Sequence, residues 1–255
     1  MSYDRREKIK SLLNEKNAVY LKELEALFPN LSSMTLRRDI EYFVREGLAV
    51  KFRGGAKASA KDTVIREPNY SYRATKNVDA KSKIAQKALS FIETGRSVYL
   101  DSGTTIMSLA DLLPDIDLSI LTSAPNIALE VLKNYKPTVN LVGGQINRDN
   151  LTVTGSQALN YIKNINIDIA FFAPSGYSTN GGFTCGNYSE CEIKRTIVKK
   201  ANKIIMLMDS SKIDKNLPFT FATFKDIDVL ITDKPLSESI QKSAAKANIE
   251  IIYTD

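Results

Sequence analysis

From Ala80 onward, short apolar and β-branched runs alternate with segments whose apolar residues repeat at helical spacing. The runs predict strands at 97–100, 118–121, 138–142, 167–172, 203–208, 227–231 and 249–253. The helical spacing predicts helices at 79–93, 104–113, 125–134, 155–163, 188–201 and 236–247. Strands that alternate with helices are typical of a largely parallel sheet with helices on both faces. We therefore predict an α/β domain for this part of the chain.

The first sixty residues show a different pattern, which predicts three short helices and a hairpin. Apolar residues at helical spacing predict helices over 3–14, 21–28 and 32–44, with Ser32 as a good N-cap for the third. The alternating stretch 48–55 ends in two glycines and predicts a small β-hairpin. Three helices followed by a hairpin indicate a winged helix-turn-helix, in which the third helix enters the major groove of DNA.

The predicted third helix carries side chains that suit DNA. Its spacing turns Ser33, Thr35, Arg37 and Arg38 away from the apolar stripe. Hydroxyls and a helix N-terminus bind phosphate, and an arginine fork reaches the O6 and N7 acceptors of guanine. The expected DNA-contacting residues are therefore Ser32, Ser33, Thr35, Arg37 and Arg38, with Lys51 and Arg53 of the hairpin on phosphate. The alternative is a helical subdomain whose arginines are merely solvated.

Charge adds modest support for a polyanion partner. Residues 1–60 hold 12 Lys and Arg against 8 Asp and Glu, whereas the other 195 residues hold 23 against 21. A small basic segment before a nearly neutral large one is typical of a nucleic-acid-binding module fused to another domain. We place the boundaries at 1–57 for the winged helix-turn-helix, 58–72 for a linker and 73–255 for the α/β domain.

Composition excludes several kinds of chemistry. The 255 residues include no histidine, which removes Ser-His-Asp and Cys-His triads and His-ligated zinc. The two cysteines, Cys185 and Cys191, are expected to be unpaired thiols in a reducing compartment. The N-terminus lacks the apolar region of a signal peptide, and no apolar run is long enough to span a bilayer. We expect a cytoplasmic protein with no catalytic residues, metal or other cofactor.

Polar and glycine-rich loops follow five of the predicted strands. The carboxyl ends of parallel strands meet at one sheet edge, where such domains bind ligands. The loop at 101–105 opens a helix with free backbone N–H groups and hydroxyls that suit an anion. Each loop alone is ordinary turn chemistry, but together they indicate a site for a small phosphorylated polyol. Its predicted residues are Asp101, Ser102, Gly103, Thr104, Thr105, Gly143, Gly144, Arg148, Ser175, Gly176, Glu192 and Lys212.

Both halves of the chain resemble the DeoR family of bacterial repressors. The string S-x-x-T-L-R-R-D-I at 32–40, then E-G-L and GGA, is similar to the DNA-binding domain of that family. The blocks V-Y-L-D-S-G-T-T, L-V-G-G, D-I-A-F-F-A-P-S-G, E-C-E-I-K-R and D-S-S-K match its effector domain in order. The resemblance implies a domain similar in fold to sugar-phosphate isomerases that senses phosphorylated sugars. It also implies a repressor of a sugar-utilisation operon.

An alternative is an isomerase-like enzyme that carries a DNA-binding module. The ribose-phosphate isomerases that this domain resembles carry paired acidic residues after the equivalent strand, whereas the loop at 173–177 has no carboxylate. A base from Glu190, Glu192 or Asp209 stays open, but recognition without turnover is favoured. A module for RNA or protein is a third alternative, although the aromatic platform of single-strand binders is missing.

The expected partners are double-stranded operator DNA and a phosphorylated sugar, with no membrane. One short helix contacts few base pairs, so we expect a homodimer or homotetramer. The sequence names neither the sugar nor the operator, and it does not give the direction of the switch.

Overall fold

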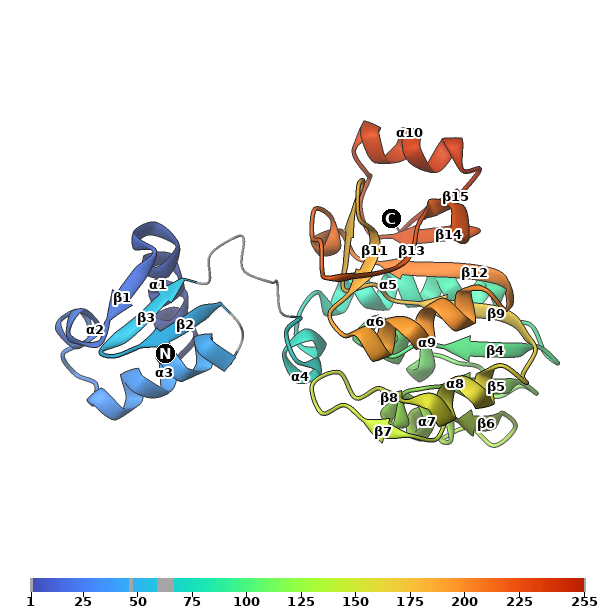
Figure 1. Cartoon of the computed structure of the whole chain (residues 1–255), viewed down its shortest axis with the longest axis horizontal. Coiled ribbons are helices and arrows are strands. Elements are labelled where there is room, and N and C mark those ends of the chain that lie inside the picture. The colour runs from blue at the N-terminus through green and yellow to red at the C-terminus, as the bar shows by residue number, and fades with distance from the viewer. Residues whose placement is uncertain (1, 46–47, 59–66, 255) are drawn as a thin grey trace. The chain divides into compact units, whose positions relative to one another are not determined.

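The computed structural model describes residues 2–45, 48–58 and 67–254, in two compact units that divide between Pro68 and Asn69 (Figure 1). Most of the predicted linker, at 59–66, lies outside the described residues. Its predicted end at residue 72 falls inside a helix, α4 (Tyr70–Ala74). The amide of Tyr70 donates to the carbonyl of Asp149 over 2.7 Å, and this hydrogen bond holds α4 to the second unit.

The first unit contains the three predicted helices and a small antiparallel sheet. The helices are α1 (Ser2–Lys16), α2 (Leu21–Leu27) and α3 (Ser33–Arg45), and the strands are β1 (Ala18–Tyr20), β2 (Ala49–Phe52) and β3 (Gly55–Ala58). The strands lie in the order β1-β3-β2. Residues 17–20, too short to bury anything alone, thus gain a partner in β3. The hairpin ends at Ala58, three residues beyond its predicted end, and β3 pairs with β1 on one side and with β2 on the other.

The two glycines of the hairpin have separate roles. Gly54 has φ +97°, a left-handed conformation that lets the chain turn between β2 and β3. Gly55 lies so close to β1 that an added Cβ would be 2.2 Å from the carbonyl oxygen of Val19. The glycine pair is therefore required by the turn and by close strand packing.

A buried carboxylate ties α1 to α3. Asp39 on α3 is 1% exposed and accepts from Arg5 Nε over 2.5 Å and Arg6 Nε over 2.9 Å. The guanidinium of Arg6 also lies 3.9 Å from the ring centre of Tyr42. These contacts add polar links to the apolar core formed by Ile9, Leu13, Val19, Leu24, Leu36, Ile40, Phe43, Ala49 and Ala56. They fix the orientation of α3 relative to α1.

The second unit is built on a parallel seven-stranded sheet, as predicted. Its strands are β4 (Ser97–Leu100), β5 (Ser119–Thr122), β6 (Thr138–Leu141), β9 (Ile167–Phe172), β12 (Ala201–Met208), β14 (Val229–Thr232) and β15 (Glu250–Tyr253). They lie in the order β15-β14-β12-β9-β4-β5-β6, and all neighbouring pairs are parallel. The loops after β4, β9 and β12 therefore meet near the centre of one edge.

Helices cover both faces of this sheet (Figure 1). One buried core joins the sheet to α5 (Val78–Ala88), α6 (Thr104–Asp111) and α7 (Pro125–Val131). The other joins it to α8 (Ser156–Ile162), α9 (Tyr188–Val198) and α10 (Glu238–Lys246). The pattern is clear in β9, where Ile169 and Phe171 enter the first core and Ala170 and Phe172 the second. Burial on both faces explains the continuous apolar runs in the sequence.

Several short elements were not predicted. The strands β10 (Gly176–Ser178), β11 (Gly182–Cys185) and β13 (Phe219–Ala222) form a second small sheet, and β7 (Gln145–Ile146) pairs with β8 (Val153–Thr154). Single-turn 3-10 helices occur at Leu89–Phe91, Ser210–Lys212 and Phe224–Asp226. These strands are two to four residues long, and none of them is the continuous apolar run that marks a strand of the large sheet. In the described part of the chain, no helix has the length and apolar character to cross a membrane.

Candidate DNA interface and ligand site

The predicted hydroxyls at the start of α3 are partly used within the protein. Ser32 Oγ accepts from the amide of Thr35 over 3.2 Å, which confirms Ser32 as the N-cap, and lies 3.0 Å from Thr35 Oγ1. Ser33 Oγ donates to Glu25 Oε1 on α2 over 2.5 Å. These bonds fix the first turn of α3 and its angle to α2. They leave the helix N-terminus exposed to solvent.

The arginine pair on α3 faces outward. Arg37 and Arg38 are exposed, whereas Leu36 and Ile40 on either side are buried in the core. In the hairpin, Lys51 is exposed and pairs with Glu41 over 3.0 Å, and Arg53 is exposed at the turn before Gly54. All the predicted DNA residues thus lie on α3 or the adjoining hairpin. The two arginines are therefore exposed cations on a helix whose opposite face is packed in the core.

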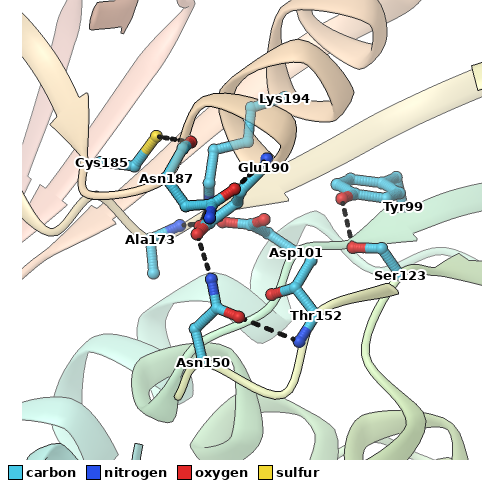
Figure 2. A network of polar contacts seen from close by, with 10 residues as sticks. All are labelled: Tyr99, Asp101, Ser123, Asn150, Thr152, Ala173, Cys185, Asn187, Glu190 and Lys194. Atoms are coloured by element: carbon cyan, nitrogen blue, oxygen red, sulfur yellow. Dashed lines mark hydrogen bonds and ion pairs between the residues drawn. The ribbon is translucent and has the colours of Figure 1, made fainter. Parts of the chain in front are cut away.

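A buried ionic network lies at the carboxyl edge of the large sheet (Figure 2). Lys194 on α9 forms an ion pair with Asp101, which directly follows β4, and another with Glu190 over 3.2 Å. Asp101 also accepts from the amide of Ala173 after β9 over 3.1 Å, and Glu190 accepts from the side chain of Asn150. The network joins the ends of β4 and β9 to α9 and to the β7–β8 hairpin.

The charges of this network depend on one another. Lys194 is 1% exposed, and burial alone would lower its pKa, but the charges of Asp101 and Glu190 outweigh that effect and raise the pKa. Burial raises the pKa of Asp101, and the Lys194 ammonium opposes this shift. Since a buried ion is tolerated only with partners, Lys194 is the cation that holds two carboxylates inside the protein.

The structure brings some predicted ligand residues together and separates others. Asp101 to Thr105 form the β4–α6 loop and the first turn of α6, and Ser175 and Gly176 follow β9 beside them; all of these residues are buried. Gly143, Gly144 and Arg148 are exposed in the segment after β6, two strands away from β4. Gly144 has a structural role, because an added Cβ would lie 2.4 Å from the carbonyl oxygen of Thr154. These three residues take no part in the buried network.

Glu192 also lies outside the network. It is two positions from Glu190 on α9, so its side chain leaves the helix about 200° away. The predicted carboxylate of this helix is replaced in the network by Glu190, four residues before Lys194. Asn150 was missed because its hairpin is joined to Glu190 only in three dimensions. The pairing of Glu190 with Lys194 could have been predicted from the sequence, because residues at i and i+4 lie on one face of a helix.

A second polar cluster, which contains Lys212, lies at the end of β12. Asp209 accepts from the side-chain amide of Asn77 over 2.9 Å and caps the turn of Lys212 by accepting from the amide of Ser211 over 3.0 Å. Lys81 on α5 is buried and donates to the carbonyl oxygens of Arg73 and Lys76 over 2.5 and 2.6 Å. Burial, together with the nearby charge of Lys212, lowers the pKa of Lys81 to about 8.

Unused hydrogen-bonding groups accompany both clusters. Asp101 Oδ1 and Asp209 Oδ2 are buried with no hydrogen-bond partner among the described residues. The hydroxyls of Ser102, Thr104 and Thr105 form no hydrogen bond within that same part of the chain. Buried acceptors without partners are costly, so these atoms indicate where a ligand with hydroxyl groups gains hydrogen bonds. The described residues show no group of three or more His, Cys, Asp and Glu side chains suited to a metal ion.

The fold and the two sites define a DNA-binding regulator with a sensor domain. Residues 5–62 match the DeoR-like helix-turn-helix domain, and residues 76–234 match the DeoR C terminal sensor domain. The chain belongs to the DeoR family of transcriptional repressors, and it is a regulator and not an enzyme.

Relatives of similar length support this assignment. The transcriptional regulator IolR of Bacillus subtilis is 33% identical over 86% of this chain and 86% of its own length. The regulator GolR of Listeria innocua is 29% identical over 98% of this chain and 97% of its own, and a putative aga operon transcriptional repressor of Escherichia coli O157:H7 is 28% identical over 98% and 93%. Among solved structures, ribose 5-phosphate isomerase A from Methanocaldococcus jannaschii aligns with 54% of this chain and 55% of its own, at 16% identity and a TM-score of 0.40.

Proposed function

We propose that this repressor controls a sugar-utilisation operon and that a phosphorylated sugar, or a related intermediate, releases it from its operator. The proposal is based on one observation: carboxylate oxygens without partners and lysine side chains lie at the same edge of the large sheet. Partnerless carboxylate oxygens of Asp101 and Asp209 suit the hydroxyls of a sugar, and Lys81 and Lys212 beside Asp209 suit a phosphate. The Escherichia coli relative, a putative aga operon transcriptional repressor, agrees with an operon-specific role.

The buried network supplies a route by which a ligand can alter the sensor domain. Asp101 is shared between the loop that opens α6 and Lys194 on α9, and Glu190 links α9 to the β7–β8 hairpin. A ligand that bonds Asp101 or the α6 loop changes the free energy of this arrangement. It can shift the protein towards release only as far as it binds the two arrangements with different affinity. We expect a homodimer or homotetramer, in which two copies of α3 contact one operator.

The direct test is a thermal-shift screen of the full chain against phosphorylated sugars, each beside its unphosphorylated sugar. Fluorescence anisotropy with the DNA upstream of the gene then reports release. We expect one phosphorylated compound to raise Tm and to lower DNA affinity, while its unphosphorylated form does neither. The phosphosugar effector would be refuted if only unphosphorylated sugars raised Tm. It would also be refuted if none of the compounds that raise Tm changed the affinity for DNA.

Lys212→Ala and Thr104→Val should blunt this response. The first removes a cation from the cluster after β12, and the second removes a hydroxyl from the first turn of α6 while conserving shape. We expect the effector concentration for half-release to rise about tenfold or more in each variant, as for one lost polar contact of about 1.4 kcal/mol. Affinity for DNA without effector should stay at the wild-type value. A variant that responds at the wild-type concentration would remove its residue from the site.

Effector binding should weaken as the pH rises above 8. The pKa of Lys81 is lowered to about 8 in the free protein, and a bound phosphate favours the charged lysine and raises that pKa. The complex then holds a proton that the free protein has lost, so affinity should fall by up to about tenfold between pH 7 and pH 9. Calorimetric titration at the two values measures it. In Lys81→Met, effector affinity should depend less on pH. If affinity falls as steeply with pH in this variant as in the wild type, Lys81 is not the group that titrates.

A further inference from the structure

Six large apolar side chains are exposed around one edge of the sensor domain. Leu129 and Leu132 on α7 are 69% and 58% exposed, and Tyr135, just after that helix, is 96% exposed. Leu141, Ile146 and Tyr161 are 43%, 57% and 42% exposed. We call these residues the β6-edge patch; they are Leu129, Leu132, Tyr135, Leu141, Ile146 and Tyr161. Clustered apolar exposure of this kind marks an interaction surface, whereas single exposed side chains are ordinary.

The patch is continuous because its elements pack on one another. α7 packs against β6, and the hydroxyl of Tyr161 on α8 donates to Asn140 of β6 over 3.3 Å. Leu141 ends β6, and Ile146 lies in β7 five residues later. Figure 1 shows α7, β6 and β7 at the same end of the sensor domain. Among the described residues of this domain, the other exposed large apolar side chains, Val78 and Tyr188, lie on α5 and α9.

Strand β6 is an open edge of the large sheet. It pairs with β5 on one side, through amides that include those of Thr138 and Val142. Alternate residues of a strand face opposite neighbours, so the N–H and C=O groups of Val139 and Leu141 point to the open side. In the described chain no strand pairs with that side. An open edge beside an apolar patch is a surface on which another polypeptide adds main-chain hydrogen bonds.

The charges at the rim suit a second copy of this chain. Asp111 and Asp115 are exposed beside Lys133 and Lys136, and Asp115 Oδ1 accepts from the amide of Lys136 over 2.8 Å. A rim with both signs lets two identical surfaces meet without like-charge repulsion, whereas DNA would require a basic one. The six side chains offer roughly 600 Å² per copy, close to the ~800 Å² that each partner of a standard interface buries.

We propose that the β6-edge patch is the surface through which two copies of this chain associate about a two-fold axis, with their β6 strands adjacent. The inference rests on the proposed function in one respect, namely that operator binding uses two copies of α3. A two-fold axis also satisfies the geometry, because the same residues of both copies then meet.

Sedimentation of the full chain tests the surface. We expect the wild-type protein to have twice the 28.4 kDa chain mass or more, and Leu129→Glu/Leu132→Glu to weaken the association at least a hundredfold. Val78→Glu is the matched control, because Val78 is 54% exposed on α5, which packs against α6, β12 and β14. The control should associate like the wild type. A monomeric wild type would leave the patch to a different protein, and an unchanged mass of the double variant would place the interface elsewhere; either result overturns the proposal.

Cross-linking gives a second measurement that does not depend on destabilising the surface. Cys185 and Cys191 are both buried, so Leu132→Cys adds the accessible thiol, and a flexible bismaleimide should join two copies. Val78→Cys should give little dimer, and dimer from Val78→Cys alone would contradict the proposal. Effector-induced thermal stabilisation separates the two hypotheses. If it persists while the double variant keeps the wild-type mass, only the interface is wrong; if it is absent while the masses change as expected, only the effector is wrong.

Discussion

Replacing Lys194 with methionine is expected to lower the free energy of unfolding by about 3–5 kcal/mol, the usual cost of removing one partner from a buried ion pair. Lys194 is 1% exposed and lies against Asp101 and Glu190, which are 1% and 4% exposed. Methionine fills a similar volume, but it leaves two buried carboxylates close together with no cation to balance their charge. Their pKa values must then rise, and the protein loses stability wherever they are ionised in the unfolded chain.

The unfolding transition of the sensor domain in urea measures this loss. The control is Lys199→Met, because Lys199 is an exposed lysine directly after α9. The loss in free energy of unfolding arises because the two carboxylates are ionised in the unfolded chain. The difference between the wild type and Lys194→Met should therefore become smaller as the pH falls towards 4, where the carboxyl groups of the unfolded chain begin to take up protons. Asp101→Asn combined with Lys194→Met should be less destabilising than the sum of the two single changes. A loss below about 1 kcal/mol at pH 7 would contradict the ionic description of this network.

Arg37→Ala and Arg38→Ala are each expected to abolish operator retention in a gel-shift assay. Both side chains are exposed on α3, and a bidentate contact from arginine to guanine contributes about 1–3 kcal/mol of discrimination, so each loss raises Kd roughly tenfold to a hundredfold. Neither substitution touches the core, since Leu36, Ile40 and Phe43 bury the opposite face. Thermal stabilisation by effector should therefore be unchanged.

Lys8→Ala on α1 is the matched control, because it removes an exposed cation from the same domain without altering α3. All proteins are compared at one salt concentration, since the phosphate contribution to affinity depends strongly on salt. If both arginine variants bind as tightly as the wild type, α3 is not the helix that reads the operator.

The sequence predicted the elements of this protein well wherever burial left a regular pattern. Strands covered on both faces are continuous apolar runs, and helices with one buried face have apolar residues at a repeat of 3.6, so the seven strands of the large sheet and their helices were identified. The antiparallel strands of the sensor domain escaped prediction because they are two to four residues long and none is a continuous apolar run. β11 also pairs with β13, which begins more than thirty residues further along the chain.

The ligand site was also predicted only in part. The loops after β4, β9 and β12 were predicted to meet, because parallel strands place their carboxyl ends at one edge. The sequence also grouped Gly143, Gly144 and Arg148 with them, although β5 separates β6 from β4 and Gly144 lies close to the backbone of β8. Local periodicity does not encode the order of strands in a sheet, so these residues could not be separated from the central loops before the fold was known.

By itself, the sequence determined the class of this protein: a helix-turn-helix with two outward arginines, and a parallel α/β domain with polar loops at its strand ends. Both follow from local periodicity and capping, which depend on neighbours a few residues away. Only the tertiary structure decided that Asp39 holds two arginines of α1, that Lys194 joins Asp101 to Glu190, and that the edge of β6 stays open. The reason is physical, because a buried charge or a strand edge is stabilised by partners that chain folding brings from distant positions.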